Sequence, residues 1–376
     1  MSQERAFTAG LLVLLQIPNV GAARLRALIS VFHSPERVLA SSPSELMRVE
    51  GVGDSIASSV VNFAKNKTAL QLAETKANHQ LELAEKLGAT LLTIWDDTYP
   101  TLLKQIYDPP VCLFVRGSLA PDTHNRFAVV GTRYPTEYGK NAVKKFTAAL
   151  AQNGFEIVSG LAYGVDTAAH HVALESGART IAVLGCGIDK IYTDPKAKLY
   201  PRIMEQGAIL SEEWIGTEPL ADNFPKRNRI ISGLSKGVLI VESDFKGGAL
   251  ITANYAIEQN RDVFAVPGSI FSHKSNGTNA LIRDSKAKLV LSPEDILSEL
   301  KLSPTNKAAA APVIARPDLS DTESIVYDAI NDEPTHIDAI ADSTGLEVSD
   351  VLVILFELEF KAHVRQLPGK FFQKVI

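Results

Sequence analysis

The chain has 376 residues, enough for roughly two to three domains with substantial cores, which excludes a small disulfide-stapled fold. Hydrophobic residues make up 45% of the sequence and charged residues 22%, a balance that excludes wholesale disorder and a collagen-like chain. The formal net charge is −5, which taken as a single number argues against a nucleic-acid partner.

The cysteine content and the N-terminal segment predict a cytoplasmic protein. Cys112 and Cys186 are too few for a disulfide framework, and they form no CxxC pair for zinc. The apolar run Ala9–Leu15 is far shorter than the roughly 20 residues of a membrane helix. It continues into Gln16 and Pro18 without a small-residue cleavage site, which argues against a signal peptide. We therefore expect neither secretion nor a membrane partner.

Residues 1–87 are expected to form a helical domain of the helix-hairpin-helix or SAM-like kind. Amphipathic patterns predict helices over Ala6–Gln16, Ala22–Phe32, Pro43–Val49, Ser55–Asn66 and Thr68–Leu87. Val49–Gly53 reads VEGVG before a helix, which is typical of a helix-hairpin-helix turn whose amides can approach a DNA phosphate. Ile17–Ala22 resembles a second copy with one glycine. A bundle that uses glycine only for its turns stays open, because no basic cluster follows Gly53.

Residues 88–302 are expected to form an α/β domain. Short apolar runs alternate with helical segments, which predicts parallel strands joined by crossover helices. The expected strands are Phe127–Gly131, Phe155–Val158, Thr180–Leu184, Ala208–Ser211, Gly237–Glu242, Asp262–Val266 and Lys288–Leu291. Together they predict a Rossmann-like, doubly wound, mostly parallel sheet.

Residues 303–317 have the composition of a linker, with four consecutive alanines and three prolines. Residues 318–376 then read as three helices followed by a hairpin across Leu367–Lys370, which is the order of a winged helix.

The charge is unevenly distributed between these modules. Residues 1–317 carry a net charge of +3 and residues 318–376 carry −8, with twelve acids and no lysine or arginine in Asp318–Phe360. The expected recognition helix, about Ser349–Phe360, carries Asp350, Glu357 and Glu359, which DNA phosphates would repel. We therefore expect the module to contact protein, although a solvated acidic face without a partner stays open. The only residues of the module that could contact nucleic acid through a positive charge are then those of the expected wing: Lys361, Arg365, Lys370 and Lys374.

The first loops that could bind a ligand follow the first two parallel strands. In an open parallel sheet, ligands bind beyond the C-terminal ends of the strands. One loop holds Gly131, Thr132 and Arg133, which offer close backbone approach, a hydroxyl donor and a guanidinium that can grip a phosphate. The next loop holds Ser159, Gly160, Tyr163 and Gly164, followed by Asp166 as the expected N-cap of a helix. We favour an anion site over a purely structural turn, because glycine, serine and a helix N-terminus coincide.

A later loop concentrates positive charge where a helix begins. Phe224 precedes Lys226, Arg227, Asn228 and Arg229. Cations at a helix N-terminus oppose its macrodipole, so a polyanionic ligand gives them a reason to be there. Phe224 and Tyr163 could stack on unpaired bases, although ordinary core packing explains either aromatic residue equally well.

Enzymatic readings find little support in the sequence. There is no GxGxxG after the first parallel strand and no GxxxxGK[ST], which argues against a dinucleotide cofactor and against a phosphate-loop NTPase. Ser159, Asp166 and His170 are residue types of a hydrolase triad, but the GxSxG elbow is missing. Glu242 and Asp244 lack a paired general acid at a recognisable spacing. We expect no catalytic residue, cofactor or metal.

Five ordered motifs resemble those of the bacterial DNA processing protein DprA family, also called Smf. They are Gly131–Arg133, Val158–His170 (VSGLAYGVDTAAH), Phe224–Ser235 (FPKRNRIISGLS), Gly248–Ala253 and Val263–Gly268 (VFAVPG). The resemblance extends over roughly residues 90–295, and the flanking modules are similar to the family's more weakly. Gly247 and Gly248 lie where relatives commonly have a Ser-Gly-Ser stretch, and we expect them in the pocket wall.

The resemblance implies a non-enzymatic protein that binds incoming single-stranded DNA during natural transformation. It implies a homodimer formed through the Rossmann-like domain, which loads the recombinase RecA onto DNA covered by single-strand binding protein. By position, Gly131, Thr132 and Arg133 would grip phosphates, and the segment from Lys226 to Arg229 would form a basic pocket.

Two other functions compete with this one. A nucleoside-monophosphate phosphoribohydrolase of the lysine-decarboxylase-like group shares this kind of sheet, but its PGGxGTxxE signature is approached only at Lys246–Ala249. An adaptor that contacts only proteins would show no salt-dependent binding to oligo-dT.

Overall fold

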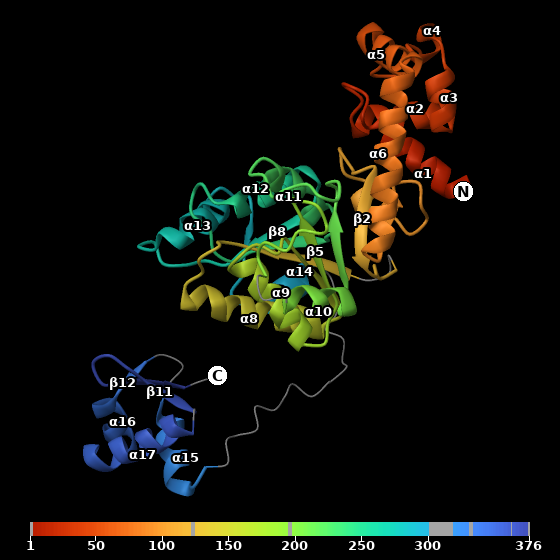
Figure 1. The fold of residues 1–376 in the computed structure, drawn as a ribbon. Coiled ribbons are helices and arrows are strands. Elements are labelled where there is room, and N and C mark those ends of the chain that lie inside the picture. Colours follow the sequence, from red (N-terminus) through yellow and green to blue (C-terminus); the bar gives the residue numbers. More distant parts are fainter. Residues whose placement is uncertain are drawn as a thin grey trace. The chain divides into compact units, whose positions relative to one another are not determined.

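The structure is a computed structural model that describes residues 3–121, 125–194, 198–300, 319–330, 334–361 and 363–374. The chain divides into two compact units, Met1–Thr305 and Asn306–Ile376 (Figure 1). The expected linker over residues 303–317 lies outside the described residues. Among the helices within the described ranges, none is both long and apolar enough to cross a membrane.

The first unit begins with a group of helices that confirms the expected helical region. These are α1 (Gln3–Leu14), α2 (Ala22–Phe32), α3 (Pro35–Ala40), α4 (Pro43–Leu46), α5 (Asp54–Lys65) and α6 (Lys67–Lys86). Helix α3 was not predicted. It is short, and it begins where the Ser34 hydroxyl accepts a hydrogen bond from the Arg37 amide with Pro35 in the first turn. Helix α4 ends three residues before the expected Val49.

The two expected hairpin turns have nearly the same backbone geometry. Gly21 precedes α2 with φ −88° and ψ −178°, and Gly53 precedes α5 with φ −87° and ψ 179°. Two residues before each of these glycines the backbone is left-handed, at Asn19 (φ 65°) and at Gly51 (φ 77°). Asparagine tolerates this region better than most residues, so Ile17–Ala22 folds as a hairpin turn despite its single glycine.

A nine-stranded sheet forms the rest of the first unit. Its strands are β1 (Ala89–Thr93), β2 (Cys112–Gly117), β3 (Asn125–Val130), β4 (Phe155–Ser159), β5 (Thr180–Leu184), β6 (Ala208–Ser211), β7 (Gly237–Ile240), β8 (Asp262–Ala265) and β9 (Lys288–Leu289). Their order is β1-β2-β6-β5-β4-β3-β7-β8-β9. Strands β3 to β9 are mutually parallel, which confirms the doubly wound sheet. Strands β1 and β2 were not predicted, and they extend the sheet in antiparallel pairing beyond β6.

Helices cover both faces of this sheet (Figure 1). One layer consists of α7 (Thr101–Lys104), α11 (Asn223–Gly233), α12 (Gly248–Glu258) and α13 (Asn276–Arg283), the last preceded by the 3-10 turn η1 (His273–Ser275). The other consists of α8 (Glu137–Gln152), α9 (Val165–Glu175), α10 (Leu199–Gln206) and α14 (Pro293–Glu299).

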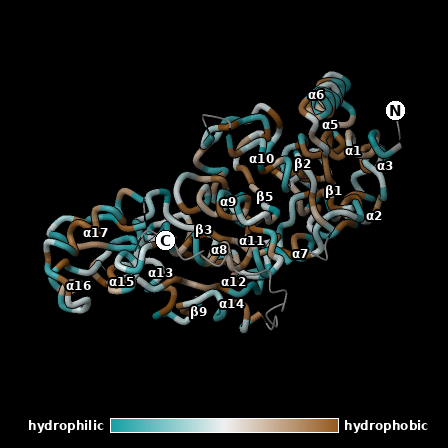
Figure 2. Tube along the Cα trace, turned by 90° about the horizontal axis from the view of Figure 1, so that it is seen from below, coloured by the Kyte–Doolittle hydropathy of each residue, from teal (hydrophilic) through white to brown (hydrophobic). Residues whose placement is uncertain are grey.

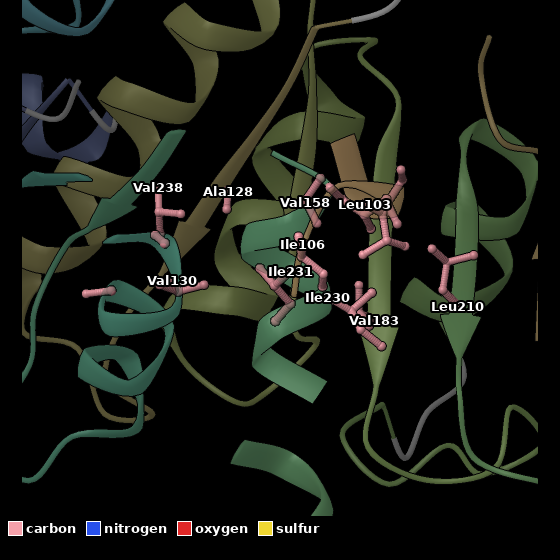
Figure 3. Close-up of a cluster of buried hydrophobic side chains, with 14 of the residues drawn as sticks. Leu103, Ile106, Ala128, Val130, Val158, Val183, Leu210, Ile230, Ile231 and Val238 are labelled. Carbon is pink, nitrogen blue, oxygen red and sulfur yellow. The ribbon is translucent and has the colours of Figure 1, made fainter. Parts of the chain in front are cut away.

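Strand β3 shows how the sequence supplies both cores. Ala128 and Val130 pack with Ile230 and Ile231 of α11 on one face (Figure 3). The intervening Phe127 and Val129 pack against α8 and α9 on the other face. Successive side chains of a strand point to opposite faces, so a strand buried on both sides reads as a continuous apolar run.

The helical region and the sheet share a core. Val111 and Cys112, at the start of β2, belong to the same buried cluster as Leu11 and Leu25. The Gln80 side chain of α6 donates to the Ile215 carbonyl (3.1 Å) and accepts from the Ile215 amide (2.8 Å). Apolar packing and a buried reciprocal hydrogen bond therefore both tie the helices to the sheet edge.

The second unit confirms the expected winged helix. It contains α15 (Asp321–Ala329), β10 (Thr335–His336), α16 (Ile337–Thr344), α17 (Val348–Phe360), β11 (Val364–Leu367) and β12 (Phe371–Lys374). The strands pair in the order β10-β12-β11, with the hairpin turn at the expected Leu367–Lys370. A separate core that includes Val326, Ile340, Leu355 and Phe372 holds the unit together.

Candidate nucleic-acid interface

A cavity of about 650 Å³ opens at the C-terminal ends of the parallel strands. Strand β3 has β4 on one side and β7 on the other, so the chain reverses direction across the sheet between β3 and β7. Such a switch point is where open α/β sheets bind ligands. The lining comes from the segments after β3, β4, β6, β7 and β8 and from helices α11 and α12. Eight predicted site residues are in that lining: Gly131, Thr132, Arg133, Phe224, Arg227, Asn228, Gly247 and Gly248.

The loops after β3 and β4 are held in close contact by two glycines. A Cβ on Gly131 would lie 2.7 Å from a Val165 methyl carbon, and a Cβ on Gly164 would lie 2.5 Å from the Arg133 carbonyl. Gly164 also has a φ of 85°, a left-handed conformation that favours glycine. The Val165 amide donates to the Thr132 carbonyl (3.2 Å). This packing leaves the Arg133 side chain exposed at the mouth of the cavity.

Gly164, not Asp166, is the N-cap residue of α9, so that prediction was wrong. The Asp166 carboxylate turns back toward the preceding loop. It accepts hydrogen bonds from the amides of Gly160 (3.1 Å) and Ala162 (3.5 Å) and lines the cavity. Burial raises the pKa of Asp166 to about 6, and nearby Arg227 only partly opposes this shift.

Arg227 lies beneath the cavity rather than in solvent. Its side chain is 6% exposed, and one terminal nitrogen donates to the carbonyls of Gly160 (2.6 Å) and Val183. Its Nε has no hydrogen-bond partner among the described residues. Burial lowers the pKa of Arg227, although the nearby Asp166 carboxylate favours the charged form. A Cβ on Gly160 would approach an Asp166 carboxylate oxygen to 2.8 Å and the guanidinium carbon of Arg227 to 2.9 Å, so a larger residue here would displace one of these two side chains.

Phe224 packs among cations and a second aromatic ring. The guanidinium carbons of Arg133 and Arg227 lie 5.9 Å and 5.8 Å from its ring centroid. The Tyr192 ring lies 5.6 Å away, centroid to centroid. The Tyr163 hydroxyl donates to the Tyr192 carbonyl (3.0 Å). Phe224 thus positions both arginines as well as lining the cavity.

Six predicted residues do not line the cavity: Ser159, Gly160, Tyr163, Gly164, Lys226 and Arg229. Ser159 is fully buried, and its hydroxyl donates to the Val129 carbonyl (2.7 Å). Arg229 donates to both carboxylate oxygens of Glu212 (2.8 and 2.7 Å) and lies 3.5 Å from Asp108. Lys226 is exposed.

The cavity also contains polar residues that were not predicted as site residues, among them Tyr134, Ser243, His273 and Lys274. Asp244, which was considered above only for an enzymatic role, lines the cavity too. The Lys274 ammonium lies 5.6 Å from the centroid of the exposed Tyr134 ring. The loop of His273 and Lys274 follows β8, whose C-terminal end lies at the same sheet edge. Their place after a parallel strand was the only feature of the sequence that could have indicated these two residues, because no glycine cluster or helix cap marks them.

The residues considered above for an enzymatic role make structural hydrogen bonds instead of forming a catalytic group. Glu242 is buried, and its carboxylate accepts from the amide (2.9 Å) and hydroxyl (2.6 Å) of Thr136 where α8 begins. His170 is also buried, with its Nδ1 2.7 Å from the Thr180 hydroxyl, and burial lowers its pKa to about 3. Ser159 and His170 each have a different partner, so they do not form a nucleophile and base pair.

Three protein-family models match the chain. The model for DNA recombination-mediator protein A matches residues 90–301, the DprA winged helix domain matches residues 308–370, and a helix-hairpin-helix motif matches residues 10–73. Protein Smf of Synechocystis is 35% identical, covering 96% of this chain and 96% of the relative. Protein Smf of Escherichia coli is 40% identical over 72% of this chain and 74% of the relative.

Two solved structures of related proteins are also similar. The X-ray structure of DNA processing protein A from Streptococcus pneumoniae has a TM-score of 0.66 and 33% identity, covering 78% of this chain and 98% of that chain. A second structure, of DNA processing protein A from Helicobacter pylori, has a TM-score of 0.51 and 32% identity, covering 57% of this chain and 95% of that chain. The Helicobacter pylori protein is described as having a unique single-stranded DNA binding mode.

Proposed function

Because the chain belongs to the DNA recombination-mediator protein A family, the DprA or Smf proteins, we propose that it binds single-stranded DNA in the cavity at the β3–β7 switch point. The family consists of DNA-binding recombination mediators rather than enzymes. The single-stranded DNA binding mode described for the Helicobacter pylori relative supports the same class of ligand here.

The observation that carries the proposal is the convergence of cations from three separate segments of the chain. Arg133 follows β3, Arg227 lies in α11, and Lys274 follows β8, yet all three line one cavity. Against these three cations, the described lining contains two acidic residues, Asp166 and Asp244. A polyanionic strand would therefore compensate an excess of positive charge in the cavity. Phosphate contacts of this kind give affinity with little dependence on base sequence.

The predicted residues divide into contacting and positioning roles. Arg133 and Lys274 contact phosphates directly, and Lys226 contacts the strand outside the cavity. Thr132 and Asn228 offer side-chain hydrogen bonds, while Gly131, Gly247 and Gly248 allow the strand to approach the backbone. Ser159, Gly160, Gly164 and Arg229 hold the loops and α11 in place through the contacts described above.

Exposed aromatic side chains offer stacking surfaces around the cavity. Tyr134 lines it. Phe245 directly follows the lining residue Asp244, Phe271 precedes the lining residue His273 by two positions, and the two phenylalanines are 60% and 91% exposed. Tyr163 is exposed beside the Phe224 cluster. Base stacking on such rings tolerates every base, which suits single strands better than duplexes.

The finer functional assignment rests on the family. We infer that the protein forms a homodimer through its Rossmann-like domain and loads RecA onto incoming DNA that single-strand binding protein covers. The phosphoribohydrolase alternative is not favoured, because the chain lacks that signature and Glu242 is bonded to the start of α8.

A matched pair of double variants tests strand binding. Arg133→Ala/Lys274→Ala should weaken binding to fluorescein-labelled oligo-dT about 100-fold in an anisotropy titration, because two phosphate contacts are lost. The slope of log affinity against log salt should shrink by about 1.4.

The control is Lys140→Ala/Lys288→Ala, which removes the same charge from two surface ion pairs, with Glu137 and Glu299. This control should bind like the unmodified protein, and both variants should keep their unfolding temperature. Equal affinity of the two double variants would rule out the cavity as the strand site.

A further inference from the structure

Helix α17 of the winged-helix unit has two apolar faces. Val351, Leu355 and Leu358 are buried in the core of that unit. On the outer side Val348, Leu352, Phe356 and Phe360 follow one another at intervals of four residues, so they form a row along one side of the helix. Leu352, Phe356 and Phe360 are 45%, 68% and 92% exposed, and Val353 beside them is 60% exposed. We call these five residues the α17 outer face; Figure 2 colours the helix by hydropathy.

This face is more than a set of scattered exposed residues. Single apolar side chains on a surface are common, but a contiguous apolar row on one helix marks an interaction site. Two of its members are phenylalanines, which bury large areas when a partner covers them.

The charges around the face exclude one common partner of a winged helix. Asp350, Glu357 and Glu359 lie on the same helix, and the segment Asp318–Phe360 contains no lysine or arginine. A recognition helix that enters the major groove must approach phosphates, which these carboxylates repel. Two cations of the wing already make contacts within the unit: the Lys361 ammonium lies 2.7 Å from Glu323, and that of Lys374 lies 4.8 Å from the Tyr327 ring centroid.

We propose that the α17 outer face is a protein-docking surface whose partner presents an apolar surface bordered by lysine and arginine. Apolar burial supplies the affinity, and the acidic border selects a basic partner and rejects nucleic acid. The same border disfavours a second copy of this face, because two acidic helices would repel each other.

The test uses the full chain and a labelled amphipathic helical peptide made only of leucine and lysine. Its control is a leucine and glutamate peptide with the same apolar face. The cationic peptide should bind in a fluorescence anisotropy titration, and the anionic peptide should bind at least tenfold more weakly. Leu352→Gln/Phe356→Gln should weaken binding of the cationic peptide at least tenfold, and Asp350→Asn/Glu357→Gln should weaken it and reduce its salt dependence.

The matched control is Leu72→Gln, which removes another exposed apolar residue, 54% exposed on α6. It should bind the cationic peptide like the unmodified chain. Three results would overturn the proposal. The first is equal peptide binding by the Leu352→Gln/Phe356→Gln variant. The second is duplex DNA binding that this variant abolishes. The third is self-association, seen as a mass in sedimentation, that disappears in the same variant and so identifies a second copy as the occupant.

Discussion

The cavity of the first unit and the α17 outer face of the second occupy positions where a DNA-binding protein is expected to carry cations, but only the cavity does. In the cavity, Arg133, Arg227 and Lys274 come from three separate segments of the chain, so the fold brings the positive charges together. On α17, the exposed residues include no lysine or arginine, and most are apolar or acidic. The net charge of −5 is a sum over the whole chain and hides this difference. The local charge of each surface, and not the total, determines which ligand the surface can bind.

The largest effect is expected for Arg227, and it tests whether this residue positions the loops of the cavity or contacts the strand directly. Arg227→Ala removes a buried cation that bonds two carbonyls and lies beside Asp166, so the free energy of unfolding should fall by about 3 kcal/mol. Binding to oligo-dT should fall as well. Urea unfolding followed by circular dichroism measures the first effect and anisotropy the second. If Arg227→Ala keeps its stability but loses binding, Arg227 contacts the strand directly and is not a positioning residue.

A charge reversal on α17 should make the second surface bind DNA as well. Asp350→Lys/Glu357→Lys places cations beside the α17 outer face and should raise the affinity of the full chain for duplex DNA about tenfold at low salt. A gel-shift titration with a labelled duplex measures this change. The gain should disappear in high salt, and Glu36→Lys/Glu74→Lys on the helical region serves as a control with the same change in charge. Equal gains from both variants would mean that overall charge, and not the place of the charge, sets duplex affinity.

The smallest expected effect comes from the acid within the cavity. The pKa of Asp166 is raised to about 6, so its carboxylate is charged at pH 7.5 and largely neutral at pH 5. Affinity for oligo-dT should therefore rise about threefold as the pH falls across this range, because a negative charge beside the phosphates disappears. The pKa is higher in the folded than in the unfolded state, so the contribution of Asp166 to stability is full below about pH 4 and is lost as the pH rises through about 6.

Asp166→Asn isolates this group. The variant should bind more tightly than the unmodified protein at pH 7.5 and should show a flatter dependence of affinity on pH. An unchanged pH dependence would assign the effect to another group.

Much of the fold could be predicted from the sequence because buried parallel strands are continuous apolar runs. Thr180–Leu184 and Ala208–Ser211 were predicted to the residue for this reason. Strands β1 and β2 were missed, because both pair antiparallel and no crossover helix connects them to the parallel strands. In the edge strand β1, Leu91 and Leu92 are also only half-buried. Helix α3 is shorter than two full turns, so it has too few residues for a periodic pattern.

The loops of the cavity could be predicted, but the partners of each side chain could not. Lys226, Arg227 and Arg229 look alike in sequence, yet the structure places one in solvent, one under the cavity and one on Glu212. Glu212 follows β6, and only the tertiary fold brings it to α11. Lys274 was missed for the same reason, since it reaches the cavity through the position of β8 in the sheet.

The shared core of the helical region and the sheet bears on cooperativity. Because Val111 and Cys112 lie in the same apolar cluster as the helices, the helical region cannot unfold without exposing the edge of the sheet. The winged helix has its own core and can open by itself. The three modules that differ in sequence pattern thus amount to two cooperative folding units.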